Sequence, residues 1–250
     1  MSQNAPTKNE AEKNEPKENT QADPSLVQSI SKNALGLALF AFITVGIIGL
    51  VQVITQDKIA FNIEQAQARA LYEIVPKNQT DNNVLTDTFE IPAVLAANNS
   101  QSKLNNLKLL GPLKEHKTVH LARQNGQLHS LIFPVVAPDG YTTGISLLIG
   151  ISIDGSIRGV RVIDHKETPG LGDKIDLKKS DWVLSFNRRS LNSPALENWK
   201  VKKDGGEFDQ FTGATITPRA VVSAVKNTLL FFKENKSTIL ELANKEIDHE

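Results

Sequence analysis

The sequence contains no cysteine among its 250 residues. This absence excludes disulfide bonds, cysteine-ligated zinc or iron–sulfur clusters, and thiol catalysis within the chain. The sequence also lacks an excess of charge, because Lys plus Arg and Asp plus Glu number 28 each, and no basic cluster is interleaved with aromatic residues. Nucleic acid is therefore not an expected partner. Any redox role therefore requires a bound cofactor.

Charge is missing altogether from one long stretch near the N-terminus. Between Lys32 and Asp57 lie 24 residues without a formal charge, and Ala34 to Ile54 is almost wholly apolar. At about 1.5 Å per residue this apolar run spans roughly 30 Å, the hydrocarbon thickness of a bilayer. We therefore expect one transmembrane helix over residues 32–56. The basic residues on its two sides are too evenly matched to predict its orientation.

A cleaved signal peptide is the alternative interpretation of this segment. Its apolar core and its leader would both be too long, and the leader is mixed in charge. Ala66-Gln67-Ala68 imitates a cleavage site, but it lies well beyond the apolar run, in a stretch where apolar residues repeat at helical spacing. We therefore expect an uncleaved anchor.

The segments that flank the anchor differ in composition. Residues 1–31 are rich in Asn, Gln, Lys, Glu and Pro, so we expect a disordered tail. Residues 57–76 are expected to form a juxtamembrane stalk helix, which ends before Pro76 because proline disfavours helical geometry in the residue that precedes it. Residues 77–250 are expected to form a single domain, of which residues 77–115 show the weakest pattern.

Two hairpins are predicted inside this domain. Val119 to Arg123 and Leu128 to Val136 flank Asn125-Gly126, while Gly144 to Ile153 and Ile157 to Ile163 flank Asp154-Gly155. Both dipeptides favour type I′ turns, which join antiparallel strands. A helix is expected from Pro218 to about Glu234, and a last helical piece from Ser237 toward the end. The predicted fold class is α+β, an antiparallel sheet with flanking helices after one transmembrane helix.

The segment Asp209-Gln-Phe-Thr-Gly-Ala-Thr215 offers a hydroxyl nucleophile on a loop of small residues. Thr217 and Pro218, which follow it, suit the N-cap and the first position of a helix. The loop therefore ends at a helix N-terminus, where unpaired N–H groups favour an anion such as phosphate, and small residues allow close approach. The alternative is an ordinary turn followed by a helix cap.

A second polar, glycine-rich loop follows the strand that ends at Ile163. It reads His165-Lys-Glu-Thr-Pro-Gly-Leu-Gly172-Asp-Lys174, and loops at strand ends commonly hold ligands. Composition alone favours the alternative, an ordinary turn around Pro169-Gly170 with His165 and Glu167 in solvent. No partner His or carboxylate stands at a recognised metal-ligand spacing, so no metal is expected.

The two loops together carry a resemblance to a known family. Asp-x-x-(Ser/Thr)-Gly-Ala-Thr resembles the flavinylation motif of membrane-anchored FMN-binding subunits, in which the last Thr, here Thr215, carries FMN through a phosphoester. His-x-Glu-Thr-Pro-Gly-Leu-Gly is similar to a signature of the G subunit of Rnf-type electron transport complexes (RnfG, also called RsxG) and of its relative, the C subunit of the sodium-translocating NADH:quinone reductase. The uninterrupted second loop followed by Trp182 resembles RnfG more closely.

This resemblance implies a site for covalently bound FMN. Thr215 is the implied attachment point, and Asp209 with Gly213 would form part of what a separate flavin transferase recognises. No His adjoins Thr215 in the sequence, so self-modification is not expected. Lys174 is a candidate to stabilise a reduced anionic flavin. The other implied contacts are Thr212, Gly213, Ala214 and Thr217 in the first loop, and His165, Glu167, Thr168, Leu171 and Gly172 in the second.

The resemblance also implies a function and a location. The chain would be the flavin-carrying relay of a complex that couples electron transfer to ion translocation, with membrane and iron–sulfur subunits as partners. It would be a single-pass protein of the bacterial inner membrane, with the N-terminus cytoplasmic and the FMN-binding domain periplasmic. Alternatives are a component like the quinone-reductase C subunit, a non-redox membrane-tethered scaffold, and a hydrolase in which His165 activates a Thr or Ser nucleophile.

Overall fold

The computed structural model describes residues 26–93 and 103–245. The chain divides into two compact units, one up to Ile59 and one from Ala60 onward. Besides two α-helices and five strands, the described residues contain six short 3₁₀ helices: η1 (Lys77–Gln79), η2 (Leu107–Leu110), η3 (Gly172–Ile175), η4 (Asp181–Phe186), η5 (Leu196–Asn198) and η6 (Lys202–Asp204).

Helix α1 (Leu26–Ile74) contains the apolar segment. Its Ile30–Ile59 portion has a mean hydropathy of 2.6 and is long and apolar enough to cross a membrane. The Thr44 and Thr55 hydroxyls donate to main-chain oxygens one turn earlier, so these two hydroxyls are satisfied within the helix. The helix begins at Leu26, so the last six residues of the expected disordered tail are helical; residues 1–25 lie outside the described part of the chain.

The second unit is built on a five-stranded antiparallel sheet in the order β1-β2-β3-β4-β5, as the predicted α+β class requires. The predicted hairpins are β2–β3 and β4–β5, whereas no local pattern indicates β1 in its weakly patterned region. The strands are β1 (Thr88–Ile91), β2 (Lys117–Gln124), β3 (Gln127–Ala137), β4 (Ile145–Ser152) and β5 (Ile157–Asp164).

The two hairpin turns differ. Asn125 and Gly126 both have positive φ, as the predicted type I′ turn requires. At the second turn only Gly155 has positive φ, so the type I′ prediction is wrong there. The longer loop explains the difference, because the Ser152 N–H donates to the Ser156 oxygen and the Gly155 N–H donates back to the Ser152 oxygen, which places the glycine at the end of the turn.

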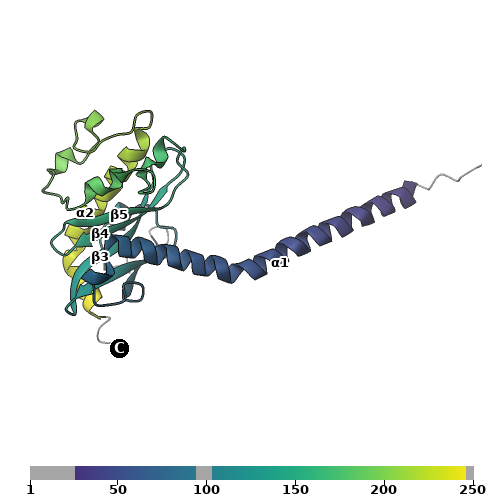
Figure 1. The fold of residues 1–250 in the computed structure, drawn as a ribbon, viewed down its shortest axis with the longest axis horizontal. Helices are drawn as coiled ribbons and strands as arrows, with labels where there is room; N and C mark the ends of the chain where they lie inside the picture. The colour runs from purple at the N-terminus through teal and green to yellow at the C-terminus, as the bar shows by residue number, and fades with distance from the viewer. Residues whose placement is uncertain (1–25, 94–102, 246–250) are drawn as a thin grey trace, which may run out of the picture. The chain divides into compact units, whose positions relative to one another are not determined.

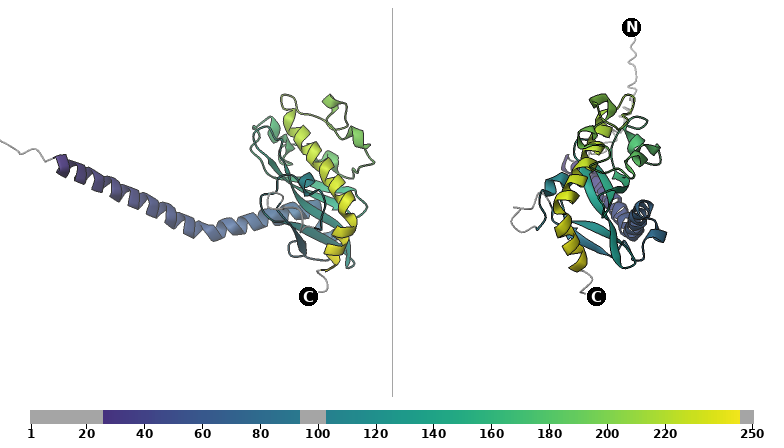
Figure 2. Two further views of the ribbon diagram at one scale, coloured as in Figure 1. Left: turned by 180° about the vertical axis from the view of Figure 1, so that it is seen from behind. Right: turned by 90° about the vertical axis from the view of Figure 1, so that its left-hand side faces the viewer.

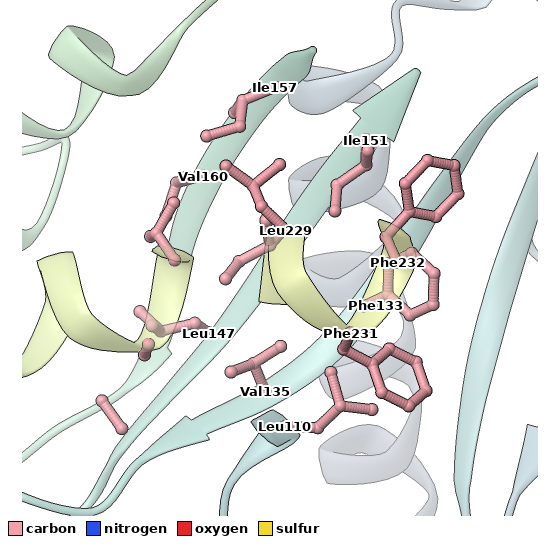
Figure 3. Packing of buried hydrophobic residues seen from close by; sticks show 14 of the residues in the cluster. Leu110, Phe133, Val135, Leu147, Ile151, Ile157, Val160, Leu229, Phe231 and Phe232 are labelled. Atoms are coloured by element: carbon pink, nitrogen blue, oxygen red, sulfur yellow. The ribbon is translucent and has the colours of Figure 1, made fainter. Parts of the chain in front are cut away.

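Both faces of the sheet are covered. Successive strand residues point to opposite faces, so Phe133 and Ile132 are both fully buried but belong to different clusters. Helix α2 (Ile216–Lys245) lies across the Phe133 face (Figures 1 and 2). The Phe133 ring meets those of Phe231 and Phe232 edge to face at 6.0 and 6.3 Å between centroids (Figure 3). This interface forms most of the core.

The C-terminal end of α1 packs on the other face. Leu71, Ile74 and Val75 are buried there against Ile132 and other residues of the sheet. Ile74 lies over Gly150 of β4, where an added Cβ would be 2.2 Å from its Cγ2 atom. Glycine at this position therefore lets the helix approach the strand closely.

Helix α2 is continuous, so the predicted break between Glu234 and Ser237 is wrong. Asn235 is buried in the middle of the helix, where its amide donates to the oxygens of Phe231 and Asn105, and its Oδ1 accepts from the Asn105 N–H. These tertiary bonds satisfy a polar residue that by itself favours turns. The helix also begins at Ile216, two residues before the predicted start.

Candidate functional site

The loop before α2 is a tight turn over Phe211–Ala214. The Ala214 N–H donates to the Phe211 oxygen at 3.1 Å, and Gly213, at the third position, has a φ of +82°. A turn with positive φ at this position favours glycine, since other residues pay a steric penalty there. An added Cβ on Gly213 would also lie 3.3 Å from Leu171 Cδ2. Gly213 thus brings the turn close to the second loop.

Thr215 immediately precedes the first residue of α2. Its oxygen accepts from the Arg219 N–H at 3.3 Å, and its side chain is half-buried. The first N–H groups of a helix have no intrahelical partner, so Ile216 and Thr217 offer two free donors beside the Thr215 hydroxyl. Pro218 has no N–H, which excludes the usual cap bond to the third helical residue. The Thr215 hydroxyl therefore lies at a site suited to an anion.

Thr217 does not cap the helix, contrary to prediction. It lies inside the first turn, its side chain is 1% exposed, and its hydroxyl donates to Oε2 of Glu167. A residue inside the first turn cannot cap the helix, so the hydroxyl is free to donate to the buried carboxylate. This contact joins the second loop to the start of α2.

The second loop folds around the main-chain oxygen of Thr168. That oxygen accepts from the N–H groups of Leu171 and Gly172, both at 3.1 Å. Gly170 has a φ of +76°, which lets the chain reverse within four residues. The reversal brings Leu171 next to Gly213.

Glu167 is the most deeply buried charged residue of this loop, with 4% exposure. Besides the Thr217 hydroxyl, its carboxylate accepts from the N–H of Tyr141 at 3.3 Å and from that of Thr142 at 3.1 Å. An added Cβ on Gly172 would lie 2.8 Å from Thr217 Oγ1 and 3.0 Å from Glu167 Oε2. The carboxylate therefore connects three separate segments of the chain around one small pocket.

This pocket has a volume of about 340 Å³, within the range of small-molecule sites. Its walls combine apolar side chains, hydroxyls and free backbone amides at a helix N-terminus, which suits a flat aromatic ring system with a phosphate tail. The lining residues are Tyr141, Glu167, Thr168, Leu171, Gly172, Gly213, Ala214, Thr215, Ile216 and Thr217.

Eight of the residues proposed from the sequence line this pocket together; four do not. Thr212 and Asp209 are exposed, and Asp209 pairs with Lys202 at 2.6 Å, which raises the pKa of the lysine. His165 is half-buried and its Nδ1 accepts from the Glu167 N–H at 3.1 Å. Lys174 is half-buried in η3. The flavin contacts of Thr212, His165 and Lys174 stay predictions, as does recognition of Asp209 by a flavin transferase.

Two pocket residues were not proposed as contacts from the sequence. Tyr141 and Ile216 are 66% and 46% exposed although both are large and apolar in character. Nothing in the local sequence places Tyr141 beside Glu167, which lies 26 residues further on. Ile216 directly follows the proposed attachment residue. A large apolar residue at a helix start was the signal in the sequence that could have identified it as a pocket residue.

An aromatic cluster packs against the loop that precedes α2. Trp182 meets Phe186 and Phe211 edge to face at 5.2 and 5.1 Å between ring centroids. Phe186 stacks on Phe208 at 4.8 Å. The cluster contacts both Phe208 and Phe211. Phe211 is the first residue of the turn that precedes Thr215, so these aromatic contacts help to fix the position of that turn.

Comparison with known proteins identifies both parts of the chain. Residues 140–230 match the FMN-binding domain family, and residues 22–74 match the RnfG N-terminal region. The matched FMN-binding region contains both loops and the whole pocket.

Similar proteins share one description, the G subunit of the ion-translocating oxidoreductase complex. The protein from Pseudoalteromonas atlantica is 46% identical over 220 residues, which cover 87% of this chain and 95% of the relative. That from Pseudomonas aeruginosa is 45% identical over 218 residues, with 87% and 95% covered. That from Vibrio vulnificus is 41% identical over 215 residues, with 86% and 95% covered. The chain therefore belongs to the RnfG family, the G subunits of ion-translocating oxidoreductase complexes, as its two loop motifs indicated.

Proposed function

We propose that this protein is the flavin-carrying subunit of an ion-translocating oxidoreductase complex, and that it relays electrons through FMN esterified to Thr215. The observation that carries the proposal is the position of Thr215. Its half-buried side chain lines a pocket at the N-terminus of α2, inside the region that matches the FMN-binding domain. A phosphate bound to this hydroxyl would meet the free amides of the first helical turn.

Attachment would exchange one phosphate bond for another. With FAD as donor, its pyrophosphate bond breaks, an ester forms between the FMN phosphorus and Thr215 Oγ, and AMP leaves with the displaced oxygen while the hydroxyl proton is released. A threonine hydroxyl needs activation, and within the described residues no hydrogen bond joins His165 to Thr215. A separate flavin transferase is therefore the proposed catalyst, and Asp209, exposed on the surface, is available for it to recognise.

The flavin supplies the electron-transfer chemistry, and the protein supplies position and electrostatics. Leu171 and Tyr141 provide exposed apolar surface against which a ring can lie. Gly172 and Gly213 keep the space between the two loops open. The ester would hold the cofactor at this place.

We further propose the arrangement of the chain in the cell. Residues 32–56, within the apolar helix portion Ile30–Ile59, would span the bacterial inner membrane once, with the N-terminus cytoplasmic and the domain from residue 77 periplasmic. Residues 57–76 would form the stalk, whose last turns pack on the sheet of that domain. Membrane and iron–sulfur subunits of the same complex would be the redox partners, since this chain has no cysteine to bind a cluster.

The proposal is tested on full-length protein purified from membranes of a host that flavinylates proteins. Intact mass should exceed that of the bare chain by one FMN less water, and the modified peptide should carry the adduct on Thr215. Thr215→Ala should remove in-gel flavin fluorescence while the protein remains folded and membrane-bound.

Two matched variants locate the hydroxyl that is esterified. Thr215→Ser keeps an alcohol at the site and should keep covalent flavin, whereas Thr212→Ala removes the neighbouring exposed hydroxyl and should leave the mass adduct in place. Covalent flavin that persists in Thr215→Ala would refute the assignment. Unmodified, colourless wild-type protein would instead favour a scaffold role.

A further inference from the structure

Glu167 supplies the one formal charge among the described residues that line the pocket. Its side chain is 4% exposed, and its two carboxylate oxygens accept only from neutral groups, namely two backbone amides and the Thr217 hydroxyl. No ion pair involves Glu167 within residues 26–93 and 103–245. Its negative charge therefore faces the pocket without a paired cation.

Neither His165 nor Lys174 neutralises this charge. His165 Nδ1 accepts the Glu167 N–H, so this nitrogen bonds the main chain rather than the carboxylate. Lys174, in η3, is not among the lining residues. The pocket thus has the opposite sign of charge from the one that Lys174 had suggested.

The carboxylate is also fixed in place. It is bonded to the turn at Tyr141 and Thr142 and to the first turn of α2, and Gly172 packs against its side chain without room for a Cβ. A charge held rigidly in a site shielded from water acts more strongly on a neighbouring group than a mobile surface charge does.

We propose that Glu167 is a positioning residue that fixes the pocket walls and, through its unpaired negative charge, lowers the reduction potential of the bound flavin. The inference rests on the proposed function of the same pocket. Reduction adds electron density to the flavin ring, and a fixed anion beside the ring disfavours that addition. Glu167 would therefore make the reduced subunit a stronger electron donor.

The test is a spectroelectrochemical titration of full-length, covalently flavinylated protein in detergent. Glu167→Gln keeps the size of the side chain and an acceptor oxygen but removes the charge. At a fixed applied potential, the ratio of reduced to oxidised flavin should rise at least about tenfold, equivalent to about 30 mV for a two-electron couple. Glu197→Gln, an identical exchange at an exposed residue of η5 outside the pocket, should leave the ratio unchanged.

Two further variants separate the charge from the packing. Thr217→Val removes one hydrogen bond but keeps the charge, so the ratio should not rise; a tenfold rise there would show that packing sets the potential and would overturn the inference. Glu167→Asp also keeps the charge, and it replaces Glu167→Gln in the titration if the latter fails to take up flavin. A ratio of reduced to oxidised flavin within threefold of wild type supports the inference, and a tenfold rise overturns it.

Two different results would contradict the role of Glu167 and the proposed function. A flavinylated Glu167→Gln protein whose potential is unchanged or lower would overturn only the electrostatic role of Glu167. Wild-type protein without covalent flavin would overturn the proposed function, and with it the inference.

Discussion

The indole Nε1 of Trp182 donates a hydrogen bond of 2.8 Å to the main-chain oxygen of Asp209. Trp182 belongs to η4, and Asp209 begins the segment that ends at Thr215. Since the same indole packs edge to face on Phe211, one side chain holds this segment through both a polar and an aromatic contact. The position of the proposed flavin attachment site thus depends on a residue from a separate, earlier element of the chain.

Trp182→Phe should loosen the attachment loop. Phenylalanine keeps an aromatic ring against Phe211 but cannot donate to Asp209, and one lost hydrogen bond costs about 1 kcal/mol. We expect the free energy of unfolding to fall by about that amount and flavin incorporation to slow. Chemical denaturation and a time course of in-gel fluorescence measure the two effects; unchanged incorporation would show that the hydrogen bond does not position the loop.

Gly172→Ala should disturb the junction between Glu167 and Thr217. The new methyl group would lie 2.8 Å from Thr217 Oγ1, and overpacking of this kind costs about 1–3 kcal/mol. Flavin content should fall together with stability. Gly170→Asn is the control, because Gly170 has open space and positive φ, which Asn tolerates. Equal effects of both substitutions on flavin content would contradict the proposed crowding at Gly172.

His120 predicts a dependence of stability on pH. Burial lowers the pKa of its ring from the ordinary value of 6.5, although its hydrogen bond to the Val84 oxygen opposes the shift. Because the folded protein binds the proton less readily than the unfolded chain, His120 costs stability as the pH falls below 6.5. The free energy of unfolding should therefore decline in acid, and less steeply in His120→Gln.

His116 provides the matched control for this measurement. Its side chain is 64% exposed, so His116→Gln should keep the wild-type decline. Urea unfolding of the detergent-solubilised chain at a series of pH values measures both variants. Identical slopes for wild type and His120→Gln would contradict the role assigned to burial.

Local patterns in the sequence predicted the elements that depend on neighbouring residues. The apolar run predicted the long N-terminal helix, Asn125-Gly126 predicted its hairpin and turn type, and Gly213 with Pro218 predicted a turn followed by a helix. Where tertiary contacts overrule local preference, the predictions were wrong: Asn235 continues a helix because Asn105 bonds its side chain, and Thr217 lies inside α2 and bonds Glu167 rather than capping the helix.

Local sequence patterns were sufficient to predict the membrane-type helix, the two hairpins and the two loops that carry the family resemblance, because each arises from residues close to one another in the chain. That Tyr141, Glu167 and Thr215 line one pocket follows from long-range packing alone, since strands, loops and 3₁₀ helices separate the first from the last. Long-range packing also decides the charge of that pocket. Glu167 is buried and lines the pocket, whereas Lys174 does not line it. No periodicity in the sequence predicts which of these two residues faces the pocket.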